Sequence, residues 1–337
     1  MFALRSLPLA GRDTRPWERP SSWLRRHNSF FLLAALLGFF SKNGSDSKTM
    51  RFSLILATVG RTEEPARFLQ HLDLQTYRHF ELIVVDQNPG AILDPLIRQY
   101  QDRFPLLHLR SECGLSRARN AGLQHASGDM VAFPDDDGWY PADLLQRVAS
   151  FFQWNPSIDG VTGRCVDGSG GDSSRFDRRS GWINRFNVWT RSNSHTIFLR
   201  REVSQLVGPF DERLGVGAKT PYGSGEETDY LLRALAHRRR LFYDSSLLVY
   251  HPQLIRLMDA RECARGRAYA RGTGHVLRRH RYPLWFPLYQ ITRSLGGAAV
   301  SAMGLDFATA RFRLNILIGR TWGWIAKESR NYSSEWR

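Results

Sequence analysis

Residues 114–137 read GLSRARNAGLQHASGDMVAFPDDD, and this stretch decides the fold. Its first half predicts a helix over residues 116–126, with Ser116 as the N-cap and Gly128 beyond its end. Residues 130–133 are a short apolar run, which predicts a strand that ends at Pro134. Three carboxylates then follow at positions 135–137. We therefore expect an acidic group at the carboxyl end of a sheet strand.

Strands and helices alternate on both sides of this stretch. Upstream, FSLILAT (52–58) and FELIVVD (80–86) predict buried strands, and a weaker strand is expected at 106–109. A helix fits residues 63–74 between the first two strands. Downstream we expect strands at 194–199 and 247–250 and a helix at 226–237. This alternation predicts an α/β fold with a doubly wound, mostly parallel sheet.

The chain divides into three regions. Residues 50–255 carry the α/β pattern, and residues 256–337 predict basic amphipathic helices, within the segments 254–281, 284–303 and 307–327. Residues 1–49 predict a poorly ordered basic and apolar arm or a weak interfacial anchor. The apolar run at 30–40 has about half the length that a bilayer crossing needs and lacks a small-x-small cleavage site. Met50 precedes the first strand directly, so we hypothesise a natural start there.

Composition and charge limit the classes of partner. Three scattered cysteines without a CxxC pair predict neither a disulfide framework nor a structural zinc site, and fit a reducing compartment. The formal charge of +15 favours anionic partners. No nucleic-acid-binding motif accompanies it, so we expect no nucleic acid partner. Residues 256–281 hold eight arginines against two acids, which predicts peripheral association with the cytoplasmic face of a membrane.

The acidic triplet predicts a metal site. Asp135, Asp136 and Asp137 repel one another unless a cation holds them, and a hard divalent cation prefers such oxygen ligands. The alternative is an acidic surface turn. The apolar strand in front of the triplet favours the metal site, because ligands of open α/β sheets bind at the carboxyl ends of strands.

The ordered motifs of the chain resemble those of family 2 glycosyltransferases. The resemblance rests on the segments 114–122, 127–129 and 133–137, quoted above. It extends over roughly residues 52–251, through Ala57-Thr58, Arg61, Gln75, Val84–Asp86, Gly208–Glu212 and Gly225–Asp229. It implies the GT-A fold and a metal-dependent, inverting transfer of sugar from a nucleotide-diphosphate sugar to an acceptor hydroxyl.

The resemblance also implies a donor site. Asp86 would accept hydrogen bonds from the base, although Gln87 and Asn88 follow it where family members often have a second acid. Thr58 and Arg61 would contact the nucleotide. Arg119 would reach the diphosphate, or else be a charge on a helix surface.

Asp135 and Asp137 match the two acids of the family's DxD pattern. Asp137 would hold Mn²⁺ or Mg²⁺, and Asp135 would hold the donor sugar, the ribose or the metal. Asp136, between them, would belong to the donor site. His251 ends a late strand and would be a further metal ligand.

The catalytic base is expected in Gly225-Glu-Glu-Thr-Asp229. The resemblance places this role on Glu227, with Glu226 and Asp229 as alternatives. A different interpretation is a capping box, because Ser224-x-x-Glu227 also fits the start of a helix.

Three other functions compete with this prediction. A nucleotidyltransferase would carry a Gly-rich loop and a lysine after the first strand, where this chain reads Ala-Thr-Val-Gly-Arg. A processive polysaccharide synthase would carry Gln-x-x-Arg-Trp, whereas Ser294 stands at the tryptophan position of Gln290-Ile-Thr-Arg-Ser. A non-catalytic membrane-surface adaptor would use the basic helices alone. We favour single-sugar addition to a lipid-linked or polysaccharide acceptor.

Overall fold

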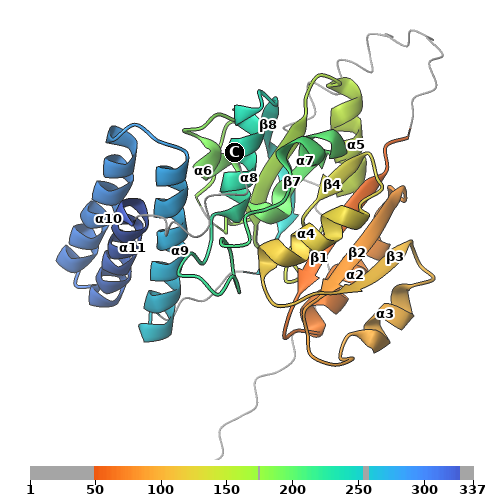
Figure 1. Ribbon diagram of the computed structural model, residues 1–337, viewed down its shortest axis with the longest axis horizontal. Helices are drawn as coiled ribbons and strands as arrows, with labels where there is room; N and C mark the ends of the chain where they lie inside the picture. The colour runs from red at the N-terminus through yellow and green to blue at the C-terminus, as the bar shows by residue number, and fades with distance from the viewer. Residues whose placement is uncertain (1–48, 174, 253–257, 327–337) are drawn as a thin grey trace, which may run out of the picture. The chain divides into compact units, whose positions relative to one another are not determined.

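The computed structural model describes residues 49–173, 175–252 and 258–326 (Figure 1). Residues from Thr49 onward belong to one compact unit. The predictions for the N-terminal arm and for the apolar run at 30–40 lie outside the described residues, as does the start of the helix predicted from residue 254.

Eight strands form one mixed sheet in the order β3-β2-β1-β4-β7-β5-β8-β6. Strands β1 to β4 run parallel, β7 is antiparallel between β4 and β5, β8 returns parallel to β5, and β6 pairs antiparallel with β8. This confirms the predicted α/β class with a mostly parallel sheet. The strands are β1 (Phe52–Thr58), β2 (Phe80–Asp86), β3 (Leu106–Arg110), β4 (Met130–Ala132), β5 (Gly160–Val166), β6 (Gly181–Trp182), β7 (Ile197–Arg200) and β8 (Leu241–Tyr250).

Helices cover both faces of the sheet because successive strand residues point to opposite faces. Leu54 and Leu56 of β1 pack into one core, whereas Ile55 and Ala57 pack into the other. The first core includes helices α2 (Glu63–Asp73), α3 (Asp94–Tyr100) and α5 (Leu144–Trp154). The second includes α4 (Leu115–His125), α6 (Val188–Arg191), α7 (Arg201–Val207) and α8 (Glu226–Ala236).

Helix α4 begins earlier than predicted. Its N-cap is Gly114, and Ser116 lies inside the first turn. The Ser116 hydroxyl donates instead to the carbonyl oxygen of Leu214 at 2.6 Å. The prediction of Ser116 as the N-cap was therefore wrong, because this side chain bonds to a distant loop rather than to its own helix.

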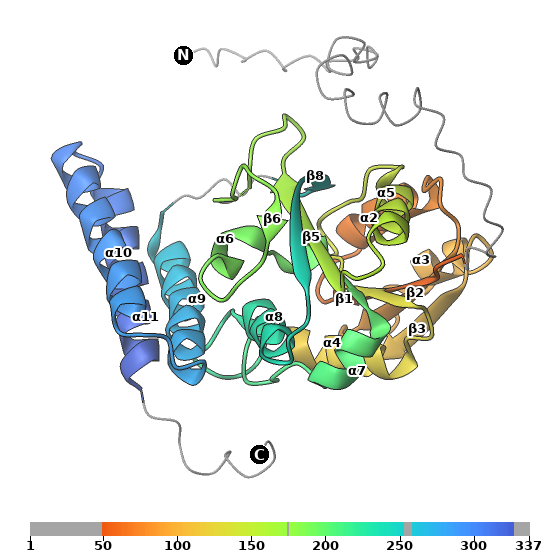
Figure 2. The same cartoon turned by 90° about the horizontal axis from the view of Figure 1, so that it is seen from above.

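Three long helices follow the sheet: α9 (Ala260–Arg279), α10 (Trp285–Met303) and α11 (Phe307–Ile325). They lie side by side at one end of the sheet (Figure 2). Helix α9 contributes Val276 and Leu277 to the second core. Helices α9 and α11 approach closely at Gly319. A Cβ atom added there would lie 2.3 Å from the carbonyl oxygen of Arg267. The predicted helical extension is confirmed, and within the described chain no helix is long and apolar enough to cross a membrane.

Candidate active site

Three strand ends bring the acidic triplet to the carboxyl edge of the sheet. Strand β4 lies parallel to β1, and a bridge joins Asp135 to Ala57. Trp139 and Tyr250 exchange backbone hydrogen bonds of 2.9 and 3.0 Å. This exchange places His251, the residue after β8, beside the triplet. The position follows from topology, since neighbouring parallel strands end at one edge.

Thr58 and Arg61 hold two of the three aspartates. The Thr58 hydroxyl donates to Asp136 at 2.6 Å. The Arg61 guanidinium donates to Asp136 at 2.7 Å and to Asp137 at 2.8 Å. Burial raises the pKa of Asp136 to about 6, although Thr58 and Arg61 favour its charged form. Both oxygens of Asp136 are therefore taken by protein groups.

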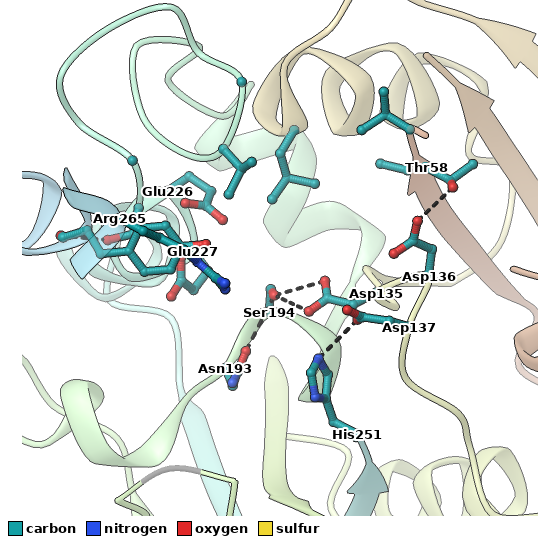
Figure 3. Close-up of a pocket in the computed structure, with 18 of the residues that line it drawn as sticks. Thr58, Asp135, Asp136, Asp137, Asn193, Ser194, Glu226, Glu227, His251 and Arg265 are labelled. Atoms are coloured by element: carbon teal, nitrogen blue, oxygen red, sulfur yellow. Dashed lines mark hydrogen bonds and ion pairs between the residues drawn. The ribbon is translucent and has the colours of Figure 1, made fainter. Parts of the chain in front are cut away.

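Asp135, Asp137 and His251 form the candidate metal group. Each offers one ligand atom, and these atoms lie within 4.8 Å of one another. The Nε2 atom of His251 lies 3.0 Å from a carboxylate oxygen of Asp137 (Figure 3). Burial alone would raise the pKa of Asp137, but His251 and Arg61 lower it below its ordinary value, so this carboxylate is ionised at neutral pH. Two carboxylates and one imidazole fit a divalent cation.

His195 and Ser194 complete the surroundings of Asp135. The Nδ1 atom of His195 lies 2.8 Å from Asp135, and the Ser194 hydroxyl donates to it at 3.2 Å. Burial would lower the pKa of His195, but the charges of Asp135 and Cys165 raise it to about 10. The sequence assigned no role to His195. Its partner lies 60 positions away, and no local pattern reports such a pair.

Arg119 lies behind the site rather than in it. Its side chain is 1% exposed and bridges Asp135, at 3.2 Å, to Glu226, at 3.1 Å. It is not among the residues that line the cavity. The contact with the diphosphate therefore stays a prediction, and in this structure the guanidinium pairs with two carboxylates of the protein itself.

Glu226 and Glu227 begin helix α8, whose N-cap is Gly225 with a φ of 98°. Burial, together with the charge of Glu226, raises the pKa of Glu227. The capping-box interpretation is not borne out. No side chain caps this helix, and the Ser224 hydroxyl donates to the carbonyl oxygen of Tyr269 at 2.8 Å. Glu227 therefore forms no capping box with Ser224, and it lines the cavity.

Asp229 does not face the cavity. Its buried carboxylate lies 2.8 Å from His280, 2.9 Å from Arg233 and 3.2 Å from Arg279. Asp229 thus lies at the centre of a buried ion-pair cluster, and its position does not support the alternative role as base.

Asp86 sits at the expected strand end, paired in register with Thr58. Its fully buried carboxylate accepts from both nitrogens of Asn88 at 2.8 Å and lies 2.8 Å from Arg110 and 3.1 Å from His108. It does not line the cavity. Its side-chain position does not support the predicted contact with the base.

A cavity of about 670 Å³ is lined by Thr58, Arg61, the acidic triplet, His251, Glu226 and Glu227. Thr58 and Asp136 lie on one side of it, and Glu226, Glu227 and Arg265 lie on the other (Figure 3). The candidate metal group lies between them. The cavity therefore has room for a ligand that spans a cation site and a carboxylate.

Comparisons with known proteins indicate the family and the fold. Residues 53–204 match the profile described as glycosyl transferase family 2. The chain contains a family 2 glycosyltransferase domain. An uncharacterized glycosyltransferase of Haemophilus influenzae is 28% identical to it over 109 residues, 32% of this chain and 36% of that protein. The chain spans between about a third and about half of the length of the curated relatives it matches, at 36%, 37% and 54%.

Two solved structures share the fold of this glycosyltransferase domain. The mannosyltransferase PcManGT from Pyrobaculum calidifontis, in complex with GDP-Man and Mn²⁺, has a TM-score of 0.57 and 14% identity, covering 82% of this chain and 88% of its own. S. aureus TarS 1-349 in complex with UDP-GlcNAc has a TM-score of 0.52 and 18% identity, covering 81% and 91%. The GT-A fold expected for this chain is confirmed.

Proposed function

We propose that this chain is an inverting, non-processive glycosyltransferase that moves a sugar from a nucleotide-diphosphate sugar to an acceptor hydroxyl. One observation supports the proposal: a single cavity is lined both by the Asp135, Asp137 and His251 group and by Glu227. The donors named for PcManGT and TarS, GDP-Man and UDP-GlcNAc, support a nucleotide-sugar donor.

The donor would occupy the side of the cavity lined by Thr58 and Arg61. Asp135, Asp137 and His251 would hold a divalent cation, Mn²⁺ or Mg²⁺. Such a cation, when bound, neutralises the charge that develops on a departing diphosphate. Asp135 is available as an ionised ligand for such a cation. Burial alone would raise the pKa of Asp135, but the charges of His195 and Arg119 lower it.

Glu227 would act as the base. The acceptor oxygen forms a bond to the anomeric carbon while the bond from that carbon to the diphosphate oxygen breaks on the opposite face. The acceptor proton passes to a carboxylate oxygen of Glu227. The raised pKa of Glu227 suits this role, because a stronger base accepts the proton more readily. Arg119 positions Glu226 beside it through the 3.1 Å ion pair.

A panel of nucleotide sugars with Mn²⁺ or Mg²⁺, assayed for nucleoside diphosphate release, tests the proposal. We expect a chelator to abolish turnover and Glu227→Gln to lower kcat by about 10²–10⁴-fold while donor affinity changes little. Glu202→Gln, which alters an exposed carboxylate on α7, is the matched control. Unchanged turnover in Glu227→Gln would remove Glu227 from the mechanism.

The same assay separates the rival functions. A nucleotidyltransferase would form or consume pyrophosphate instead of releasing nucleoside diphosphate. A membrane-surface adaptor would retain its function in Asp137→Ala, whereas we expect this change to abolish metal-dependent turnover. A processive synthase would build long products, whereas we expect one sugar per acceptor.

A lipid-linked or polysaccharide acceptor at the cytoplasmic face of a membrane remains part of the proposal. Support comes from the turn between α10 and α11, named here the hairpin tip (residues 300–307). Val300, Met303, Leu305 and Phe307 of the tip are 62 to 77% exposed. Exposed apolar side chains on a strongly basic chain suit an anionic lipid surface.

A further inference from the structure

Two C-terminal helices contribute one stripe each to the wall of the cavity. Arg265, Tyr269 and Thr273 of α9 line it at intervals of four residues, and Ile316 and Arg320 of α11 line it at the same interval. Residues four apart lie on the same helix face. Both helices therefore present a continuous face to the cavity, and each face carries an arginine.

Arg320 has no counter-ion among the described residues. Its guanidinium donates only to neutral oxygens, the carbonyl of Gln290 and the hydroxyl of Ser294, and it forms no ion pair within the described part of the chain. Its Nε atom is buried without a hydrogen-bond partner. Burial and the charge of Arg293 lower the pKa of Arg320 to about 10. A half-buried cation that has no ion-pair partner is stabilised when an anion binds beside it.

Arg265 supplies a second cation on the same wall. Its guanidinium lies 3.3 Å from the carboxylate of Glu262 and 5.3 Å from the ring centre of Tyr269. Figure 3 shows it beside Glu226 and Glu227, across the cavity from Thr58 and Asp136. An anion bound here would lie near the proposed base and away from the proposed donor side.

We propose that Arg320 and Arg265 form an anion subsite that binds a phosphate group of the acceptor. The inference rests on the proposed transferase function and names the class of its acceptor: a phosphorylated molecule. Planar guanidinium groups match phosphate oxygens with paired hydrogen bonds. Tyr269 and Ile316, beside the two arginines, offer apolar contacts to the group that carries the phosphate.

The packing of α9 on α11 restrains the backbone positions of the two arginines. The close approach at Gly319 leaves no space for a side chain between these helices. The two helices therefore present both arginines from one rigid backbone frame, and a bound phosphate would hold the acceptor on the Glu227 side of the cavity.

Calorimetric titration of phenyl phosphate into the full chain tests the subsite. Mn²⁺ and the nucleoside diphosphate released in the donor assay are present at saturation, so that the donor diphosphate site is already filled. We expect Arg320→Gln and Arg265→Gln each to weaken phenyl phosphate binding at least tenfold, because charge-assisted hydrogen bonds are lost. Arg320→Lys keeps the charge but loses the paired N–H donors of the guanidinium, so it should weaken phenyl phosphate binding less than Arg320→Gln does. Arg261→Gln removes an exposed charge one turn away on α9 and should change nothing.

Two results would overturn the subsite. One is equal affinity for phenyl phosphate in wild type and in both glutamine variants. The other is a weaker affinity for the nucleoside diphosphate in those variants, which would assign the arginines to the donor. Arg265→Gln alters an exposed side chain, so it decides the question even where Arg320→Gln fails to fold. Failure of the proposed function is distinct, since no donor would then release nucleoside diphosphate.

Discussion

Asp229 shows how an acidic residue inside a functional motif can serve stability. Burial would raise its pKa, but the hydrogen bond to His280 and the charges of Arg233 and Arg279 lower it to about 2. The folded state thus favours the ionised carboxylate over the unfolded state, where the pKa is near 3.8. The stabilisation is fully present above pH 4 and is lost as the pH falls toward 2.

We therefore expect Asp229→Asn to lower the free energy of unfolding by about 3–5 kcal/mol at pH 7, because Arg233 and Arg279 lose a buried carboxylate partner. The deficit should narrow below about pH 4. Urea denaturation at a series of pH values measures both effects. The control Asp102→Asn, at an exposed position, should stay within about 0.5 kcal/mol of wild type. A stable Asp229→Asn variant with abolished turnover would contradict this structural role.

Glu226 should set the pH range in which the proposed base, Glu227, is active. Because burial and the neighbouring charge of Glu226 raise the pKa of Glu227, the ionised base forms only as the pH rises through this raised value. The kcat/KM should therefore increase with pH on its acidic limb. In Glu226→Gln the repulsion is removed, so the limb should move to lower pH. A limb at an unchanged pH would show that Glu227 does not control it.

Two side chains of the predicted donor site point away from the cavity, and they do so for a shared physical reason. Motif order located the strand ends correctly, so Thr58, Arg61, Glu227 and the acidic triplet line one cavity with His251. It could not show which way a side chain at such an end points. Asp86 and Arg119 turn into the protein because partners from other segments are available there. The role of His195 was not predicted for the same reason, because its partner Asp135 belongs to a distant segment of the chain.

At the scale of elements, helix α9 sets the position of the start of α8. A Cβ atom on Gly272 would lie 2.0 Å from the carbonyl oxygen of Ser224, two residues before Glu226. Gly272→Ala should therefore displace the start of α8, and with it Glu226 and Glu227. We expect a loss of about 1–3 kcal/mol in the free energy of unfolding and a fall in turnover.

The matched control for this prediction is Gly296→Ala on α10, where an added Cβ atom meets nothing within 4 Å. This change should be neutral or stabilise the fold by up to about 1 kcal/mol, because alanine favours a helix. Thermal unfolding and nucleoside diphosphate release compare the two variants. Equal behaviour of both would show that α9 does not hold the start of α8 in place.

The order of the strands shows a second limit of sequence patterns. Hydrophobic runs identified β1, β2 and β4 because each is locally apolar. The insertion of antiparallel β7 between β4 and β5 depends on pairing across the chain, such as Ala132 with Phe198. The strand predicted from residue 194 also begins late, at Ile197, because Ser194–Thr196 form a 3₁₀ turn that points polar groups toward Asp135.

At the scale of the whole molecule, the active cavity and the apolar surface are separate features. Met303 and Phe307 of the hairpin tip are 76% and 66% exposed, and neither lines the cavity. If the tip enters a lipid surface, replacing both with serine removes buried apolar area without altering the donor site. Burying one large apolar side chain contributes about 1.5–3 kcal/mol, so binding should weaken at least tenfold.

Sedimentation with vesicles of phosphatidylglycerol and phosphatidylcholine measures this effect, and Trp154→Ser on α5 is the control. Trp154 is 81% exposed, so it matches the tip in exposure but belongs to a helix of the other core. We expect the control to bind vesicles as wild type does, and all three proteins to release nucleoside diphosphate from a soluble donor equally. Vesicle binding that survives in the tip variant but disappears at high salt would assign the membrane contact to the arginines alone, because salt screens charge but not apolar burial.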